Sequence, residues 1–447
     1  MFGLMETGFQ HFYWGNAVMI IIALVFIYLG IGKKMEPLLL IPIGFGMLLV
    51  NLPLGGLMDY AMDIKAPVSG NVIQIQVNEG AKFKEGDILL QLDSGDVSAP
   101  TYGKVDKIRV SPGQHVDAGD VVASTITTAQ TDQSKVLTSP EGILARIFKY
   151  GIMWHIIPPL IFLCLGALTD FGPMIANPKT LFLGAGAQFG VYFAFFGALL
   201  CGFTMREASS IGIIGGAEGP TTILVTSILA PHIISTTAMA CYSYMALVPI
   251  IQPPIIKLFT SKAERAIYMK PELREVPQLE KIIFPILCAI ISILFVPMSA
   301  PLMGLFMIGN LFRECGVLDR LSDTASTSLV DILTIFITLA IGGSMVAENF
   351  LRIQTLLILV LGAIAFAAAT AAGVILAKTM NLFSKEKINP MIGAAGVSAV
   401  PMSARVVQEM GQKENFMNIL LMHAMGPNVA GAIGAAVAGG VFLSMLK

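Results

Sequence analysis

Long apolar runs constrain the fold of this chain more than any other feature. An α-helix needs roughly 17–25 apolar residues to cross the hydrocarbon core of a bilayer. Runs near this length lie at 16–32, 37–57, 151–168, 181–203, 234–257, 282–297, 301–314 (short), 327–346, 351–378 and 416–445. Charged residues make up 13% of the chain, whereas soluble domains carry about 25%. The pattern predicts a polytopic α-helical membrane protein and excludes a soluble enzyme and a disordered chain. A nucleic-acid binder is excluded as well, because 28 basic residues are balanced by 29 acidic ones.

Two further apolar stretches, 207–230 and 389–406, are interrupted by Gly and Pro in the middle. Non-helical backbone at membrane depth is tolerated only where it lines a cavity or is buried in protein. At a shift of 178 residues, Ile214-Gly215 of the first stretch matches Ile392-Gly393 of the second. Paired interrupted segments in two halves of a chain are typical of transporter binding sites. We predict inverted repeats with two re-entrant helical hairpins, with chance identity among small apolar residues as the alternative.

Residues 62–130 have a different pattern, in which apolar and polar residues alternate between many turn residues. This region also repeats itself at a shift of 33. Ala66-Pro67 recurs at Ala99-Pro100, and Gly86-Asp87 recurs at Gly119-Asp120. The pattern predicts a small all-β insert built from two interlocked half-sheets.

The repeated phrases "APVSGNVIQIQVNEGAKFKEGDILLQLDS" and "APTYGKVDKIRVSPGQHVDAGDVVAS" resemble the biotinyl/lipoyl barrel-sandwich family. That family carries its prosthetic group on a lysine in the hairpin between the repeats. The corresponding hairpin here, Leu92 to Ser98, contains no lysine, and there is none between Lys84 and Lys104. We therefore predict a barrel-sandwich module that is neither biotinylated nor lipoylated.

The predicted domain organisation follows from these features. It comprises N-terminal transmembrane helices (1–61), the barrel-sandwich insert (62–130), a first membrane repeat (131–262), a connecting loop with scaffold helices (263–326) and a second membrane repeat (327–447).

Positive charge predicts the side of each loop, because cytoplasmic loops are rich in Lys and Arg. The loop 257–281 holds six basic residues and is placed in the cytoplasm. The same side is expected for Lys33, Lys34, Arg313, Arg320, Lys378, Lys385 and Lys387. If both broken stretches are re-entrant, the β insert and both termini face outside. If one of them crosses fully, the insert moves to the cytoplasm.

Glu218 is the acid of the first broken stretch, between Ala217 and Gly219-Pro220. An ionisable residue at membrane depth is costly and marks an ion or substrate path by default. Its carboxylate, unwound backbone carbonyls and the hydroxyls of Thr221 and Thr222 form a hard-oxygen set suited to Na⁺. The alternative is an exposed loop in which Glu218 has no role.

The second broken stretch offers an amide, hydroxyls and a guanidinium. Asn389 and Ser398 can supply neutral oxygens to an ion. Arg405 can hold a carboxylate through a bidentate bond, although snorkelling to the interface is an equal alternative. In the helices that follow the two breaks, Tyr242 or Tyr244 can donate a proton, although a packing role is the more common one for such a tyrosine.

Several long motifs resemble the β subunit of biotin-dependent sodium-pumping decarboxylases, the oxaloacetate, methylmalonyl-CoA, glutaconyl-CoA and malonate systems. They include "GALTDFGPMIANPKTLFLGAGAQFG", "IGIIGGAEGPT", "YSYMALVPIIQPP", "INPMIGAAGVSAVPMSARV" and "LLMHAMGPNVAGAIGAAVAGGV". The resemblance implies a membrane carboxybiotin decarboxylase that consumes a proton from the far side and drives Na⁺ outward. It also implies inverted repeats with two re-entrant hairpins and an oligomeric scaffold.

The resemblance also implies roles for individual residues. Glu218, Tyr244 and Arg405 are implied as catalytic, and Arg405, Asn389, Ser398 and Gly393 as contacts of carboxybiotin. Glu218, Asn389, Ser398 and Asn428 are implied as Na⁺ ligands. One departure is that Glu218 stands where the family usually has Asp, which places the carboxylate about one bond length further out.

The implied cofactors are Na⁺ and a carboxybiotin that a separate subunit presents, not one bound covalently to this chain. The implied partners are a biotin-carrier/carboxyltransferase α subunit, a small membrane γ or δ subunit and further copies of this chain, and the implied location is the cell membrane. Two alternatives stay open on the residues alone. A Na⁺-coupled secondary transporter shares the broken helices but needs no carrier, and an anchoring subunit leaves Glu218, Asn389 and Arg405 unexplained.

Overall fold

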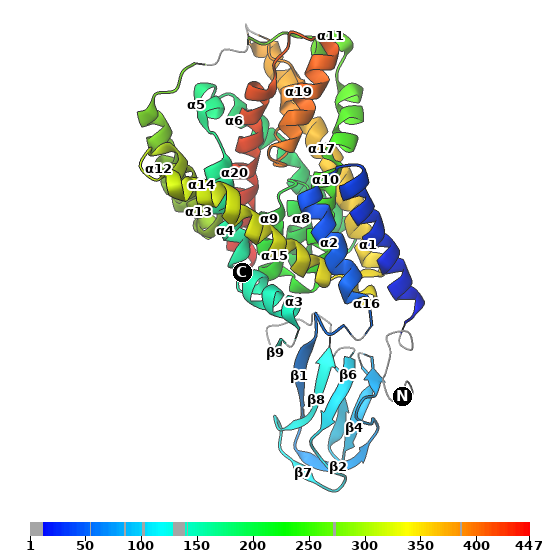
Figure 1. Cartoon of the computed structure of the whole chain (residues 1–447). Helices are drawn as coiled ribbons and strands as arrows, with labels where there is room; N and C mark the ends of the chain where they lie inside the picture. The colour runs from blue at the N-terminus through cyan, green and yellow to red at the C-terminus, as the bar shows by residue number, and fades with distance from the viewer. Residues whose placement is uncertain are drawn as a thin grey trace. The chain divides into compact units, whose positions relative to one another are not determined.

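The computed structural model describes residues 12–53, 55–84, 86–100, 103–127, 139–140, 142–270, 274–384 and 387–447. It contains helices and a separate group of strands (Figure 1). The longer helices are α1 (Trp14–Gly32), α2 (Pro37–Val50), α4 (Ile157–Leu168), α6 (Thr180–Ala187), α7 (Phe189–Leu200), α8 (Met205–Ile214), α9 (Gly219–Leu229), α10 (Ile234–Phe259), α12 (Gln278–Phe295), α13 (Ala300–Glu314), α15 (Val330–Gly343), α17 (Ile353–Phe383), α19 (Met402–Glu414) and α20 (Leu421–Leu446). The short ones are α3 (Ile143–Arg146), α5 (Gly172–Ala176), α11 (Lys262–Arg265), α14 (Asp319–Thr324), α16 (Ala347–Phe350) and α18 (Met391–Ala394).

Among the described residues, seven helices are long and apolar enough to cross a membrane. These spans are Trp14–Gly32, Thr180–Leu200, Pro231–Phe259, Gln278–Phe295, Asp319–Gly343, Ile353–Phe383 and Leu421–Leu446. The prediction of a polytopic helical membrane protein is confirmed.

Three predicted runs, 37–57, 151–168 and 301–314, are not among these seven spans, and the last of them forms α13, a helix of 15 residues. The run 151–168 forms one arm of a pair, Ile143–Met153 and Ile157–Leu168, that bends by 68°. α2 ends at Val50, well short of residue 57. The side chain of the following residue, Asn51, donates to the carbonyl oxygens of Met47 and Met345 at 2.8 Å each and so terminates the helix in a turn.

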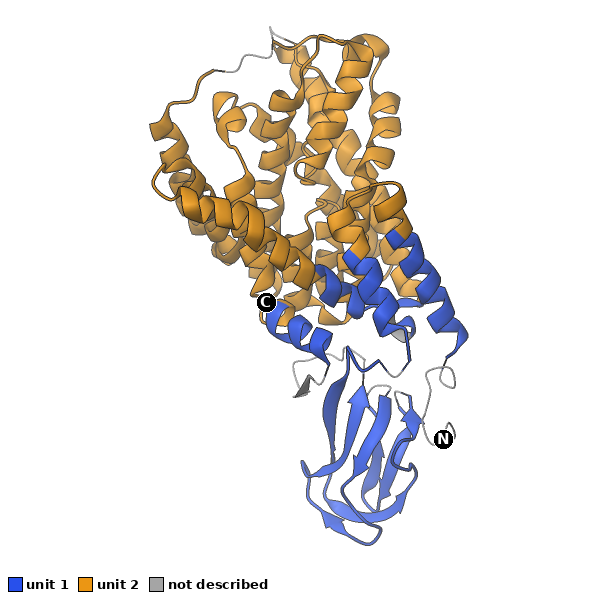
Figure 2. Ribbon diagram, in the orientation of Figure 1, with its two compact units in different colours: residues 1–27, 42–151, 338–351 blue, residues 28–41, 152–337, 352–447 orange. Residues whose placement is uncertain are grey.

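The chain divides into two compact units (Figure 2). Unit 1 comprises residues 1–27, 42–151 and 338–351, and unit 2 comprises residues 28–41, 152–337 and 352–447. Unit 1 holds the β module, and unit 2 holds both broken segments.

The first broken segment consists of α8 and α9, which pack against each other. Glu207 in the first turn of α8 and His232, which follows α9, are 25 positions apart, yet Glu207 Oε1 and His232 Nε2 are 2.7 Å apart. The two free ends of the α8–α9 pair therefore lie side by side, so that α9 returns to the end of unit 2 from which α8 departs.

The second broken segment consists of α18, an interrupted stretch and α19. At its start, Asn389 Nδ2 donates to the carbonyl oxygens of Arg265 (2.8 Å) and Ile267 (3.0 Å). At its end, Asn415 Nδ2 donates to the carbonyl oxygen of Ala266 at 3.4 Å. Both ends of this segment therefore contact the same three-residue stretch of one loop.

The two ends of each broken segment lie together, and we call this place the opening of the segment. The openings of the two segments lie at opposite ends of α10 and α17. The hydroxyls of Thr236 and Thr355 are 3.4 Å apart near the starts of these two helices, and Lys378 Nζ donates to the carbonyl oxygen of Phe259 at 3.1 Å near their other ends. The opening of the first segment, marked by His232, directly precedes α10. The loop 265–267, which holds the second opening, follows α10.

The strands form two sheets in the described part of unit 1. They are β1 (Tyr60–Lys65), β2 (Gly70–Ile75), β3 (Lys82–Phe83), β4 (Ile88–Leu92), β5 (Gly95–Ser98), β6 (Gly103–Ile108), β7 (His115–Val116), β8 (Val121–Thr127) and β9 (Ser139–Pro140). One sheet has the order β3-β6-β8-β1-β9 and the other the order β5-β4-β2-β7.

The sequence repeat explains this order. A shift of 33 relates β2 to β6, β3 to β7 and β4 to β8. Each short strand lies in the sheet of the other half, since β3 pairs with β6 and β7 pairs with β2. The buried core between the sheets includes Val72, Leu90, Val105 and Val122. Residues 128–130 of the predicted β region lie outside the described residues.

The turn between β4 and β5 lies within the hairpin Leu92 to Ser98, between the two sequence repeats. Here the turn residues are Asp93 and Ser94. Asp93 accepts hydrogen bonds from the backbone and side-chain nitrogens of Asn71 at 2.8 Å each, and these bonds lower the pKa of the Asp93 carboxyl. The turn is thus anchored to β2 through an acid rather than extended by a lysine.

This chemistry predicts that the purified subunit carries no biotin or lipoate, because residues 85–103 contain no lysine to accept either group. The intact mass is expected to equal that of the unmodified chain, and an avidin blot of the isolated subunit to be negative. An added mass of biotin or lipoate within this segment would contradict the prediction.

Candidate functional site

The two broken segments meet at their interruptions. The backbone nitrogen of Ser398 donates to the carbonyl oxygen of Gly216 at 3.0 Å, and Ser398 Oγ donates to the same oxygen at 2.8 Å. These residues are 182 positions apart. The breaks predicted from Gly and Pro in the two stretches are therefore neighbours in space.

The break of the first segment presents Glu218 at the N-cap of α9. Ala217, just before it, has a φ of +55°, a left-handed conformation that costs a residue with a Cβ on the order of 1–2 kcal/mol. Glu218 is extended, its side chain makes no capping hydrogen bond, and Pro220 follows in the first turn of α9. Its side chain is 3% exposed. Folding therefore places a carboxyl group inside the protein without using it to cap the helix.

Glu218 lines a cavity of about 130 Å³. The polar residues in the wall are Glu218, Tyr242, Ser398, Thr169 and Thr334. Apolar side chains, among them Phe306, Met245 and Ile337, form most of the rest. The structure thus brings Glu218 and Ser398 into the wall of one cavity, and Tyr242 lines the same cavity.

Oxygen atoms without a hydrogen-bond partner lie near this cavity. Asn428 Nδ2 donates to the carbonyl oxygens of Ala395 (2.9 Å) and Val397 (2.8 Å), immediately before Ser398. Asn428 Oδ1 has no partner among the described residues, and the same holds for Gln188 Oε1 and Thr221 Oγ1. All three side chains are less than 7% exposed. Buried oxygens without donors are available to a cation that prefers oxygen ligands.

Gln188 was not predicted from the sequence as part of the site. It stands between α6 and α7, and its Nε2 donates to the carbonyl oxygen of Gly431 at 3.0 Å. A Cβ on Gly216 would lie 3.3 Å from Gln188 Oε1, which places this oxygen beside the break of the first segment. An amide in the middle of the apolar run 181–203 was the signal that could have identified it.

The cavity contains a carboxylate but no cluster of metal-binding side chains. Among the described residues, no three His, Cys, Asp or Glu side chains are placed to hold a metal together. A cation at this site would therefore meet one carboxylate and neutral oxygens, a ligand set for a weakly held monovalent ion rather than a resident transition metal.

Gly393 makes a close backbone contact. A Cβ at this position would lie 2.1 Å from the carbonyl oxygen of Gly373 on α17, and the reverse substitution at Gly373 would meet the carbonyl oxygen of Gly393 at the same distance. The first half of the chain repeats this contact, because a Cβ on Gly215 would lie 2.1 Å from the carbonyl oxygen of Gly190. Both contacts allow a short helix to touch its neighbour directly.

The structure places Asn389 and Arg405 away from the Glu218 cavity. The amide nitrogen of Asn389 is used by the loop carbonyls described above, and its Oδ1 accepts from the backbone nitrogen of Met391 at 3.1 Å. Arg405 is exposed on α19 and lies near Glu36. Burial raises the pKa of the Glu36 carboxyl, and the positive charge of Arg405 opposes this rise.

Tyr244 also lies outside the wall of the cavity. Its hydroxyl donates to the carbonyl oxygen of Leu359 on α17, and the side chain is 6% exposed. Tyr242, one of the two tyrosines that the sequence left open as a proton donor, is the one that lines the cavity.

The two interrupted helices lie in contact beside a buried carboxylate, together with amide and hydroxyl oxygens that have no partner among the described residues. These features define a polytopic membrane protein of the ion-translocating class. Comparison with known proteins narrows this class. The family described as the Na⁺-transporting oxaloacetate decarboxylase beta subunit matches residues 15–446.

Individual relatives agree with this match. The methylmalonyl-CoA decarboxylase subunit beta of Propionigenium modestum is 49% identical over 98% of this chain and 97% of its own length. The probable oxaloacetate decarboxylase beta chain of Vibrio cholerae is 47% identical, with the same coverage of both chains. The oxaloacetate decarboxylase beta chain 2 of Salmonella typhimurium is 45% identical, also over 98% and 97%.

The chain belongs to the family of Na⁺-transporting decarboxylase beta subunits. This confirms the family resemblance seen in the sequence and, with it, the predicted function class, a decarboxylase subunit coupled to sodium transport.

Proposed function

We propose that this subunit decarboxylates carboxybiotin delivered by a carrier on another subunit and uses the reaction to move Na⁺ outward. The observation that carries the proposal is the contact of Ser398 with Gly216, because it joins the two broken segments beside the buried Glu218. In the reaction, the bond between the ureido nitrogen of biotin and the carboxylate carbon breaks. The electron pair stays on the nitrogen, which takes up a proton, and CO₂ leaves.

The architecture supports two re-entrant hairpins in inverted repeats. α8 and α9, with 10 and 11 residues, are each too short to cross a bilayer. The Glu207–His232 pair closes the first hairpin at one end, and the loop 265–267 holds both ends of the second at the other. Each broken segment is followed by a helix of 26 residues, α10 or α20.

The charges support one orientation. Arg265 pairs with Glu414 (2.8 Å) and Lys378 with Glu264 (3.1 Å) at the end where the second segment opens. This end holds much of the basic loop 257–281. We therefore place this end of unit 2 on the cytoplasmic side of the cell membrane. Lys385, one of the charges used for the prediction, lies outside the described residues.

The β module is proposed to face outside and to be a barrel-sandwich domain. This side follows from the count of basic loops, with the loop 257–281 and Lys33-Lys34 placed in the cytoplasm and both broken segments counted as re-entrant. The exchange of β3 and β7 between the two sheets supports the barrel-sandwich classification.

A cysteine introduced at exposed Ser98 of β5 in a cysteine-free background is expected to react with an impermeant thiol reagent in intact cells. A cysteine at Lys262 in the basic loop is the matched control and is expected to react only after the membrane is opened. Labelling of position 98 only in opened cells would place the β module in the cytoplasm and contradict the re-entrant arrangement.

We assign the Na⁺ site to Glu218, Ser398 and Asn428, with the unpartnered oxygens of Gln188 and Thr221 as additional candidates. The contacts of Ser398 and Asn428 with the two breaks support this assignment. Asn389 is kept as a further Na⁺ ligand through its Oδ1, while its Nδ2 fixes the start of the second segment to the loop.

Arg405 and Tyr244 are proposed to act on carboxybiotin. Arg405 is an exposed guanidinium in the first turn of α19, and it forms no hydrogen bond or ion pair with the described residues. It is suited to receive the carboxylate of the incoming group. Tyr244 is proposed to help deliver the proton that replaces CO₂.

These two roles predict different kinetic effects. Tyr244→Phe is expected to lower the turnover number about tenfold or more with little change in the apparent KM for the carboxylated carrier, because it removes a transition-state group. Arg405→Lys is expected to raise that KM several-fold, because an ammonium cannot form the two parallel bonds of a guanidinium. Steady-state decarboxylation in proteoliposomes measures both, and the reverse pattern would exchange the two roles.

The proposed assembly contains an α subunit with the biotin carrier and carboxyltransferase, a small γ or δ membrane subunit and several copies of this chain. The beta-subunit names of the relatives support an assembly of different chains. The acid decarboxylated upstream is set by the carboxyltransferase, and both oxaloacetate and methylmalonyl-CoA relatives match this chain.

A further inference from the structure

A second cavity in unit 2 lies where one membrane-spanning helix begins and another ends. Its volume is about 280 Å³. One span starts at Thr180 and another ends at Phe383, and both of these residues line the cavity. The cavity therefore lies at the boundary of the apolar layer, at the depth where the headgroups of lipids meet their hydrocarbon chains.

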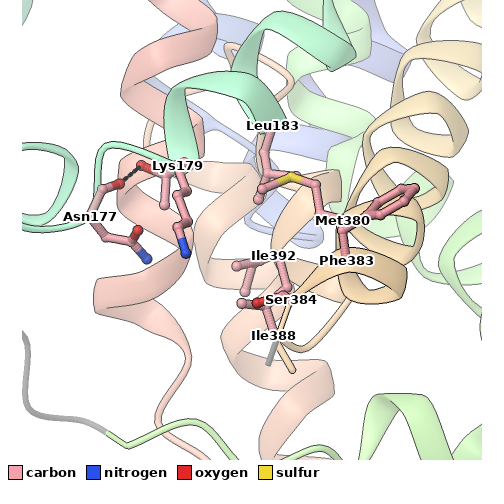
Figure 3. A pocket seen from close by; sticks show the side chains of 9 residues that line it. Asn177, Lys179, Leu183, Met380, Phe383, Ser384, Ile388 and Ile392 are labelled. Atoms are coloured by element: carbon pink, nitrogen blue, oxygen red, sulfur yellow. Dashed lines mark hydrogen bonds between the residues drawn. The ribbon is translucent and has the colours of Figure 1, made fainter. Parts of the chain in front are cut away.

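The two sides of this cavity differ in chemistry (Figure 3). Asn177 and Lys179 lie on one side, and Leu183, Met380 and Ile392 lie on the other. Lys179 is exposed, and in the described part of the chain its ammonium has no ion-pair or hydrogen-bond partner. Among the described residues that line the cavity there is no Asp or Glu. The cavity therefore combines an apolar wall with a positive charge that no acid in the wall balances.

The surface beside the cavity is apolar and exposed. Phe182 is 66% exposed, Leu382 79% and Phe383 87%, and all three lie at the ends of the two spans that form the cavity. In a protein that spans a bilayer, such side chains contact lipid. The apolar wall of the cavity is thus continuous with the lipid-facing surface, whereas Lys179 lies at its polar edge.

We propose that this cavity binds an anionic phospholipid, with the phosphate at Lys179 and Asn177 and the upper part of an acyl chain against the apolar wall. A lysine near the membrane surface attracts anionic lipids, and the amide nitrogen of Asn177 can donate to a phosphate oxygen. The volume lies near the lower limit for small-molecule sites, about 300 Å³. It therefore suits one part of a lipid rather than the whole molecule.

The charge of the cavity favours an anionic lipid over a zwitterionic one. Phosphatidylglycerol brings a single negative charge, which matches one ammonium without a neighbouring acid. Phosphatidylcholine brings a positive charge as well, which Lys179 repels. Other occupants match only one side of the cavity. A free phosphate leaves the apolar wall uncovered, and an uncharged apolar molecule leaves the ammonium unpaired.

A lipid in this cavity contacts the second broken segment at its start. Ile388 and Ile392 of this segment line the cavity. The next residue, Gly393, packs directly on the backbone of α17, because a Cβ there would lie 2.1 Å from the carbonyl oxygen of Gly373. The lipid therefore fills the space between α6, α17 and the start of the second segment.

The first test uses the purified full chain in detergent, with a single cysteine at Ser384 in a cysteine-free background. Ser384 lines the cavity, so dioctanoyl-phosphatidylglycerol is expected to slow the reaction of this cysteine with N-ethylmaleimide. Half protection is expected at a concentration about fivefold lower than with dioctanoyl-phosphatidylcholine, the effect of one lysine near a membrane surface. A cysteine at exposed Lys262, which does not line the cavity, is the control and is expected to show no protection by either lipid.

Variants of Lys179 test the source of this preference. Lys179→Gln is expected to make the half-protective concentrations of the two lipids equal. Lys179→Arg is expected to keep most of the preference, and Lys262→Gln all of it. Equal protection by both lipids with Lys179 present, or no protection by either, would overturn the proposal. Protection by inorganic phosphate alone would also overturn it and assign the cavity to a soluble anion.

A second measurement needs no introduced cysteine. Dioctanoyl-phosphatidylglycerol is expected to raise the midpoint of thermal unfolding of the unaltered chain by several degrees more than dioctanoyl-phosphatidylcholine does, because a ligand that binds only the folded state stabilises it. This difference is expected to vanish in Lys179→Gln and to persist in Lys262→Gln. The same rise with both lipids in the unaltered chain would contradict the proposal.

Discussion

Replacing Glu218 with glutamine is expected to lower Na⁺-stimulated decarboxylation and Na⁺ transport about 100-fold or more, while the protein stays folded. The substitution keeps size and shape and removes only the charge. Glu218 is 3% exposed and makes no side-chain capping bond. The amide of glutamine can therefore take the place of the carboxylate in the fold. A 100-fold loss corresponds to about 2.7 kcal/mol of lost stabilisation.

Two matched variants complete this experiment. Glu218→Asp is expected to keep activity with an altered Na⁺ dependence, because the charge remains but is drawn back by about one bond length. Glu409→Gln removes an exposed carboxylate from α19 and is expected to have no effect. Activity measured as a function of Na⁺ concentration distinguishes them, and a fully active Glu218→Gln protein would remove this residue from the ion site.

Gly393→Ala is expected to produce the second large effect. The new Cβ would lie 2.1 Å from the carbonyl oxygen of Gly373, a contact between backbone atoms that no side-chain rotation relieves. Overpacking of this kind costs typically 1–3 kcal/mol and sometimes more. The start of the second hairpin must then move away from α17, so we expect a lower midpoint of thermal unfolding and loss of most Na⁺-coupled activity.

The control for this variant is Gly304→Ala on α13. A Cβ there would have only Ile293 Cδ1 near it, at 3.8 Å. Thermal unfolding followed in detergent is expected to show a midpoint near that of the wild type for Gly304→Ala and a clearly lower one for Gly393→Ala. Equal midpoints and equal activities would show that the close approach of α18 and α17 is not needed.

Much of the architecture was predictable because it depends on local pattern. The long apolar runs identified the spanning helices, and Gly and Pro within 207–230 and 389–406 identified the interruptions, which the structure places at Gly215–Glu218 and between α18 and α19. The alternating pattern and the 33-residue repeat identified the β region. The classification of the hairpins as re-entrant and of the β region as a barrel-sandwich stays a prediction that the contacts support.

The site was predictable in part. Glu218 and Ser398 stood out as polar groups within broken apolar segments, and the structure places both in the wall of one cavity. The positions of Tyr242 and Gln188 could not be predicted, because they depend on which faces of α10 and of the α6–α7 break turn toward Glu218. The ion-ligand role of Asn389 stays a prediction. The contacts of its amide nitrogen with the carbonyl oxygens of Arg265 and Ile267 could not be predicted, because they join segments far apart in the sequence.

If decarboxylation by this subunit drives Na⁺ across the membrane, CO₂ release and ²²Na⁺ movement measured together in proteoliposomes that contain the complete complex must depend on each other. The account predicts that adding the carboxylated carrier starts both at once, that each requires Na⁺, and that avidin stops both. Na⁺ movement that proceeds without CO₂ release, needs a counter-transported solute and is indifferent to avidin would contradict the account and identify a secondary transporter.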